Sequence, residues 1–124
     1  MILADTNSWI AYLAGAPGDD VEALDKALSL GATAMIPPVL AELLSYPKLS
    51  SADATRLGRI PELATLPGFW LRTGLLRAAL ARKRCKPKLV DTMVAQYCLD
   101  HQATLVTRDR DFKPFVRHAG LLLL

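Results

Sequence analysis

Four acidic residues occupy positions from which a parallel β-sheet would bring their side chains together. They lie far apart in the chain, each beside a short apolar run: Asp5, Glu42, Asp91 and Asp109. Oxygen ligands without a convergent His or Cys favour Mg²⁺ or Mn²⁺ over zinc. Each residue alone has an ordinary explanation as a cap, a first-turn acid, a turn former or a solvated helix residue. Four carboxylates at one edge are costly unless a cation or a shifted protonation compensates them, so a divalent-metal site is the leading hypothesis.

Such a cluster suits phosphodiester hydrolysis, because a bound metal lowers the pKa of water and neutralises charge that builds on the phosphate. A polyanionic substrate also needs basic residues nearby. The net charge is only +3, but no Asp or Glu occurs between Leu63 and Val90, where many Lys and Arg residues fall. A solvated helix face is the alternative explanation of this charge run. The residues predicted to bind nucleic acid are Arg82, Lys83, Arg84, Lys86, Lys88, Arg108 and Arg110.

Short apolar runs alternate with amphipathic segments. Strands are expected over 2–4, 33–36, 63–66, 104–107 and 121–124. Helices are expected from a cap at Asn7 or Ser8 to Leu13, from Asp19 or Asp20 to Gly31, from Pro37 through Leu44, from Ser50 or Ser51 to Pro61, from Pro67 through Leu80 and from Leu89 through Cys98, with a short helix or turn over 111–115. This alternation predicts a three-layer α/β fold, with a central parallel sheet of four to five strands flanked by helices.

The predicted topology places the carboxylates. All strands of a parallel sheet with right-handed crossovers end at one edge, so Asp5 and Asp109, each just after a strand, emerge there together. The helix from Leu89 feeds the next strand and must begin at that same edge, which puts Asp91 beside them. The helix after the second strand also starts there, so Glu42 lies over the same crevice.

Length and composition bound the class of protein. A chain of 124 residues, 52% of them hydrophobic, is expected to form a single domain over residues 1–124. No apolar run reaches the length of a membrane span and no signal segment is evident, so a cytoplasmic protein without a membrane partner is expected. Cys85 and Cys98 are too few for a disulfide scaffold, and Cys98 is expected in the core.

Four motifs resemble those of a PIN domain, and the closest match is the VapC-type ribonuclease toxin of toxin-antitoxin pairs. They are Asp5-Thr6-Asn7, Pro38-Val39-Leu40-Ala41-Glu42-Leu43, Asp91-Thr92-Met93-Val94-Ala95 and Leu105-Val106-Thr107-Arg108-Asp109-Arg110-Asp111-Phe112. The resemblance implies a Mg²⁺- or Mn²⁺-dependent endoribonuclease, usually a homodimer, that a cognate antitoxin holds inactive. It covers nearly the whole chain. The segment Lys86-Pro87-Lys88 departs from the family pattern, in which a Gly is common.

The resemblance also implies residue roles. Asp5, Asp91 and Asp109 would hold one or two ions, and Glu42 would serve as a ligand or as the base to the attacking water. Supporting residues would be Thr107 through its hydroxyl, Asp111 as a secondary acid, and Asn7 from the first motif. The alternatives are a DNA-directed or housekeeping PIN nuclease and a non-catalytic PIN-like RNA-binding scaffold. Nothing in these residues reads a 2′-hydroxyl, so RNA over DNA rests on the resemblance alone.

Overall fold

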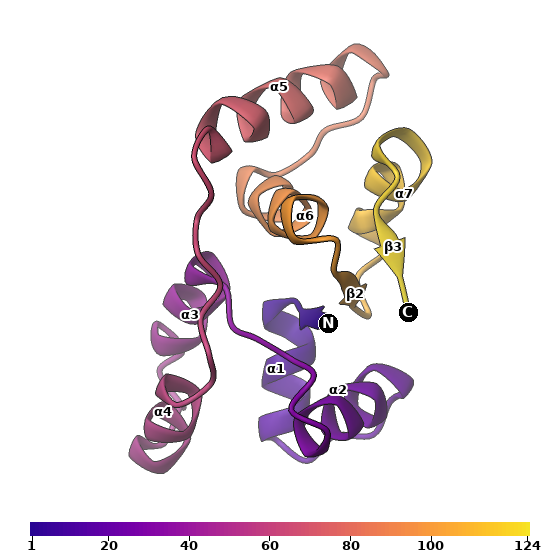
Figure 1. The fold of residues 1–124 in the computed structure, drawn as a ribbon. Coiled ribbons are helices and arrows are strands. Elements are labelled where there is room, and N and C mark those ends of the chain that lie inside the picture. Colours follow the sequence, from indigo (N-terminus) through magenta and orange to yellow (C-terminus); the bar gives the residue numbers. More distant parts are fainter.

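A computed structural model describes residues 1–124, and Figure 1 shows its helices gathered around a small sheet. In chain order the elements are β1 (Ile2–Ala4), α1 (Thr6–Leu13), α2 (Asp19–Ser29), α3 (Pro37–Leu44), α4 (Ser51–Gly58), α5 (Phe69–Arg82), α6 (Leu89–His101), β2 (Thr104–Val106), the 3-10 helix η1 (Arg110–Phe112), α7 (Lys113–Ala119) and β3 (Leu122–Leu123). The α/β architecture predicted from the alternation of apolar runs is confirmed.

The regular part of the sheet is smaller than predicted. It has three parallel strands in the order β1-β2-β3. The two other expected strands are reduced to isolated parallel bridges, Ile2 with Thr33 and Met35 with Glu62. Prolines are the physical reason: Pro37 opens α3 directly after this segment, and Pro61 has no N–H to donate to a longer ladder. The bridges still continue the sheet beyond β1.

Helices cover both faces of the sheet. In Figure 1, α1 and α2 lie on one side of the strands, α6 lies on the other, and α5 lies outside α6. The strand residues Leu3 and Leu105 are fully buried, and so are Leu24 of α2 and Ala95 of α6. Strands covered on both faces must be apolar at nearly every position, which explains the sequences Ile-Leu-Ala and Thr-Leu-Val.

The start of α1 lies at the sheet edge, where a side chain caps the helix. The cap of α1 is Asp5, not Asn7 or Ser8 as predicted, because Asp5 directly follows the strand and its carboxylate accepts from Ser8 N. Cys98 is buried in α6 as expected, and burial raises the pKa of its thiol to about 12. None of the helices combines the length and apolarity that a membrane crossing requires.

Candidate active site

The pairing of β1 with β2 brings two polar side chains together at the carboxyl edge of the sheet. Ala4 pairs with Val106, so the next residues along the two strands, Asp5 and Thr107, emerge side by side. Asp5 N donates to Val106 O across 3.3 Å, and the Thr107 hydroxyl donates to Asp5 Oδ2 across 2.5 Å. The predicted convergence at this edge is therefore built directly from the strand register.

Asp5 is the most buried of the acidic residues, with 5% of its surface exposed. Its Oδ1 accepts from Ser8 N at 3.0 Å, while Oδ2 accepts from Thr107. Burial raises the pKa of Asp5 above its usual value, the hydrogen bonds from Thr107 and Ser8 oppose that rise, and the charge of Asp109 adds to it. These hydrogen bonds fix the carboxylate in one orientation.

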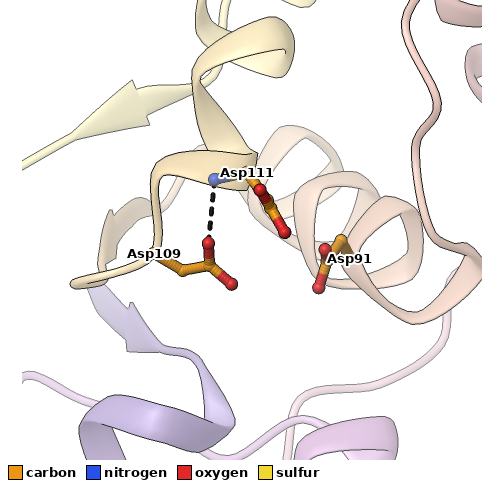
Figure 2. A group of neighbouring side chains, drawn as sticks. All are labelled: Asp91, Asp109 and Asp111. Atoms are coloured by element: carbon orange, nitrogen blue, oxygen red, sulfur yellow. Dashed lines mark hydrogen bonds between the residues drawn. The ribbon is translucent and has the colours of Figure 1, made fainter.

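A second group of carboxylates faces Asp5 from α6 and from the loop after β2. Asp91, Asp109 and Asp111 each offer an oxygen within 4.8 Å of the others. Figure 2 shows Asp91 on its helix, with Asp109 and Asp111 opposite it across the gap. Asp109 Oδ1 accepts from Asp111 N at 2.8 Å, which sets the turn that presents both side chains. Burial raises the pKa of Asp91 to about 6, and the charge on Asp109 is the next cause.

Glu42 completes the site from α3. It lines one cavity of about 330 Å³ together with Asp5, Asp91 and Asp109. Thr6, the first residue of α1, donates its hydroxyl to Glu42 Oε1 across 2.5 Å. All four predicted acids therefore meet at one cavity. Thr6 and Asn7 line the same cavity, whereas Asp111 belongs to the carboxylate cluster at its side.

The donor set of this cavity fits a hard divalent cation. The cavity offers carboxylate oxygens together with the oxygens of Thr6 and Asn7, and neither His nor Cys lines it. Oxygen ligands of this kind suit Mg²⁺ or Mn²⁺ better than zinc. Burial and neighbouring negative charge raise the pKa values of Asp5 and Asp91, and a bound cation would oppose this rise.

The basic residues predicted to bind nucleic acid divide into different environments. Lys88 lines the acidic cavity, and its Nζ lies 3.9 Å from Asp111 Oδ2. Lys86 and Arg110 line an adjoining hollow. Arg82, Lys83 and Arg84 are exposed at the end of α5 and in the turn after it, and they line none of the hollows at this edge.

Arg108 has a protein partner. Its Nε donates to Asp20 Oδ2 at 2.8 Å, and its Nη2 donates to Asp20 Oδ1 at 3.0 Å. Ser8 Oγ donates to the same Asp20 carboxylate at 2.8 Å. The hydrogen bond from Arg108 lowers the pKa of Asp20. This contact ties the loop between Thr107 and Asp109 to the start of α2.

Sequence reasoning missed two residues that hold the site. Thr6 orients Glu42, and Asp20 holds Arg108. Thr6 had one local signal, since it is a hydroxyl residue directly after Asp5 at a helix start. Asp20 had none, because its only visible role in the sequence was to begin a helix.

The protein is an α/β domain in which four carboxylates gather at the carboxyl edge of a parallel sheet. The chain belongs to the PIN domain family, whose model matches residues 2–117. PIN domains are generally nucleases. Comparison with curated proteins finds none that matches this sequence.

Solved structures agree with this assignment. The structure of VapBC2 from Rickettsia felis bound to a DNA fragment from its promoter aligns with a TM-score of 0.76 and 25% identity, covering 100% of this chain and 98% of the other. FitAcB from Neisseria gonorrhoeae aligns with a TM-score of 0.72 and 22% identity, covering 100% and 96%. FitAB bound to an IR36 DNA fragment aligns with a TM-score of 0.69 and 19% identity, covering 100% and 94%. The last two likenesses concern the fold alone.

Proposed function

We propose that this protein is a Mg²⁺- or Mn²⁺-dependent endoribonuclease that hydrolyses RNA phosphodiester bonds in the cytoplasm as the toxin of a type II toxin-antitoxin pair. The observation that carries the proposal is the convergence of Asp5, Glu42, Asp91 and Asp109 on one cavity. A scaffold has no need for facing carboxylates, since their mutual repulsion costs stability.

The surroundings of each acidic residue suggest its role in the proposed reaction. Asp5, held by Thr107 and Ser8, and Asp91 and Asp109 across from it would hold the cation. A bound Mg²⁺ or Mn²⁺ supplies positive charge to the phosphate and acidifies the attacking water. Glu42 is exposed at the cavity and oriented by Thr6, which suits a group that accepts the proton of the water or completes the ligand set.

The proposed partners are an RNA substrate, a cognate antitoxin and a second copy of the chain. The likeness to VapBC2 supports the toxin-antitoxin assignment. Exposed apolar side chains on α5, with Trp70 at 63%, Leu71 at 69% and Leu75 at 60%, support a protein contact on that helix. A short neighbouring gene encoding a DNA-binding protein would support the toxin assignment over a housekeeping nuclease.

The test is cleavage of an RNA pool and a matched single-stranded DNA by the purified protein in Mg²⁺, Mn²⁺ or EDTA. Metal-dependent cleavage of RNA that Asp91→Asn abolishes is expected. Asp25→Asn, an equal change at an exposed position of α2, is the matched control. Cleavage of the DNA alone would transfer the activity to the DNA-directed alternative. Cation binding without cleavage of either polymer would favour the scaffold.

A further inference from the structure

The acidic cavity opens sideways into a basic hollow. Lys88 and Asp91 line both spaces. The second hollow adds Lys86 and Arg110, and Asp111 of the acidic cluster also lines it. The sign of the charge therefore changes from negative to positive as the surface leaves the site on this side.

A third hollow continues the path along α5. It shares the segment 85–88 with the second hollow and passes Arg77. Apart from Arg77, the residues of α5 that line it have small side chains, Gly74, Ala78 and Ala81. Spaced at about one helical turn, they leave a shallow trough along the helix. The three hollows form one continuous path from the carboxylates to the surface of α5.

The basic groups along this path are free of strong partners. Lys86, Arg110 and Arg77 form no ion pair with any acidic residue. Lys88 is 3.9 Å from Asp111, and both side chains are mostly exposed, so their attraction is weak. No Asp or Glu lines the third hollow. Polyanion binding here would compete with no ion pair except the weak one of Lys88 with Asp111.

The side chains along the same path favour contacts with phosphates over contacts with bases. Neither the second nor the third hollow is lined by an aromatic residue, an Asn or a Gln. Base stacking and base-edge recognition of single strands rely largely on such side chains. Lys and Arg side chains on an open trough instead fit the phosphate backbone, whatever the sequence.

The path is joined mechanically to the acidic site. Arg77 Nε donates to Pro87 O at 3.1 Å, which holds the 85–88 segment against α5. The next carbonyl, Lys88 O, accepts from Thr92 N at 3.0 Å and from Thr92 Oγ1 at 2.7 Å in the first turn of α6. Asp91 lies in that same turn. Lys86 and Lys88 are therefore presented by the same segment that positions Asp91.

We propose that a single RNA strand leaves the acidic cavity along this path, its phosphates held by Lys88, Lys86 and Arg110 and then by Arg77. The proposal rests on the endoribonuclease function and adds its substrate-binding surface. Of the basic residues predicted to bind nucleic acid, it assigns phosphate contacts to Lys88, Lys86 and Arg110. It adds Arg77 to them. Nucleotides on one side of the scissile bond then contribute affinity without regard to their sequence.

The test compares the wild type with the double variant Lys86→Ala, Arg110→Ala, both exposed positions. Steady-state cleavage is measured on oligoribonucleotides of about 12 and about 3 nucleotides across a salt series. The double variant is expected to raise KM for the longer RNA by a larger factor than it lowers kcat. Losing two phosphate contacts lowers the slope of log KM against log salt by about 1.4. The short RNA, which only fills the cavity, is cleaved as by the wild type.

The double variant Lys26→Ala, Arg59→Ala removes two charges at exposed positions outside the path and is the control for net charge. Melting curves establish that the variants fold. A double variant with wild-type KM and salt slope on the longer RNA would overturn the path while leaving the nuclease intact. A wild type that cleaves nothing would remove the proposed function instead. In that case, fluorescence anisotropy of the labelled longer RNA in EDTA tests the path by the same salt slopes.

Discussion

The Thr107 hydroxyl donates a hydrogen bond to Asp5 Oδ2 across 2.5 Å, although 102 residues separate the two in the chain. The same Thr107 oxygen accepts from Asp109 N at 3.0 Å. One hydroxyl thus joins the buried carboxylate of Asp5, directly after β1, to the loop that carries Asp109. Adjacent strands make this possible, because their register puts both residues at the sheet edge.

Thr107→Val keeps the shape of the side chain and removes both hydrogen bonds. Loss of a bond to a buried charged acceptor is expected to cost about 1–3 kcal/mol of unfolding free energy. Disorder of a carboxylate that supports the metal is expected to lower cation affinity and cleavage by roughly 10–100-fold. Denaturant unfolding and metal titration measure the two effects. Thr107→Ser restores the hydroxyl and should recover most of both, and equal loss in the Ser and Val variants would contradict this role.

Cation binding should depend on pH through Asp91, whose pKa burial and the charge of Asp109 raise to about 6. A carboxylate must be deprotonated to bind metal, so the apparent affinity should increase by roughly tenfold per pH unit below 6 and level off above it. Isothermal titration with Mn²⁺ across this range measures the change. The informative range extends about one pH unit on either side of the Asp91 pKa of about 6. A cation affinity that stays constant over this range would show that Asp91 does not control binding.

Asp91 should also cost the metal-free protein stability at neutral pH. Its folded pKa of about 6 lies above the ordinary Asp value of 3.8, so the folded state holds the proton more tightly than the unfolded state. The metal-free protein therefore loses stability as the pH rises from about 4 to about 6, by at most about 3 kcal/mol. Asp91→Asn should remove this dependence and stabilise the metal-free protein at pH 7. Thermal melts in EDTA at several pH values measure it, and a destabilised Asn variant at neutral pH would contradict the expectation.

Glu42→Gln should separate activity from stability. Glu42 is exposed and makes one side-chain hydrogen bond, to Thr6. Removing the charge is expected to lower kcat by about 100-fold or more with little change in melting temperature. Thr6→Val should give a smaller loss in kcat, because Glu42 is present but not oriented, and Thr6→Ser should restore it. Wild-type cleavage by the Gln variant would remove Glu42 from the mechanism.

Asp111→Asn tests whether the secondary acid takes part in the site. Its carboxylate lies within 4.8 Å of those of Asp91 and Asp109, and its exposed contact with Lys88 is weak. The variant is expected to lower cation affinity by about tenfold without changing stability. Asp53→Asn on α4 is an acidic control outside the site. Unchanged affinity in the Asp111 variant would assign its side chain to the surface.

Arg108→Ala should weaken the fold near the site more than it weakens RNA attraction. Arg108 donates twice to Asp20, whose side chain is 8% exposed, so its removal leaves a buried carboxylate with only Ser8 as a side-chain donor. A lower melting temperature and slower cleavage are expected. The pKa of Asp20 is lower in the folded protein than its ordinary value, so the ion pair stabilises the fold fully above that ordinary value. This stabilisation should be lost as the pH falls through the lowered pKa. A reduced salt slope of RNA binding with an unchanged melting temperature would instead indicate a direct phosphate contact.

Much of the fold was predictable because local patterns carry it. The buried runs at Ile2 and Thr104 have the apolar character of strands covered on both faces, and Pro37 marks the start of α3. The strands expected near Thr33 and Leu63 failed as regular strands, since their length depends on pairing partners and on the prolines beside them. Apolar composition does not report how many ladder bonds a segment finds.

The sequence by itself determined which four acids gather at the site, because a parallel sheet with right-handed crossovers places Asp5, Glu42, Asp91 and Asp109 at one edge. Only the tertiary structure decided which groups hold them. The hydrogen bonds of Thr107 with Asp5 and of Thr6 with Glu42 join residues from different elements, and so does the ion pair of Arg108 with Asp20. Such contacts depend on register, rotamer and the closure of long loops, none of which a linear pattern records. Tertiary contacts also distinguish basic residues that look alike in the sequence. Arg108 pairs with Asp20, whereas Lys86 and Arg110 line the second hollow without an ion pair.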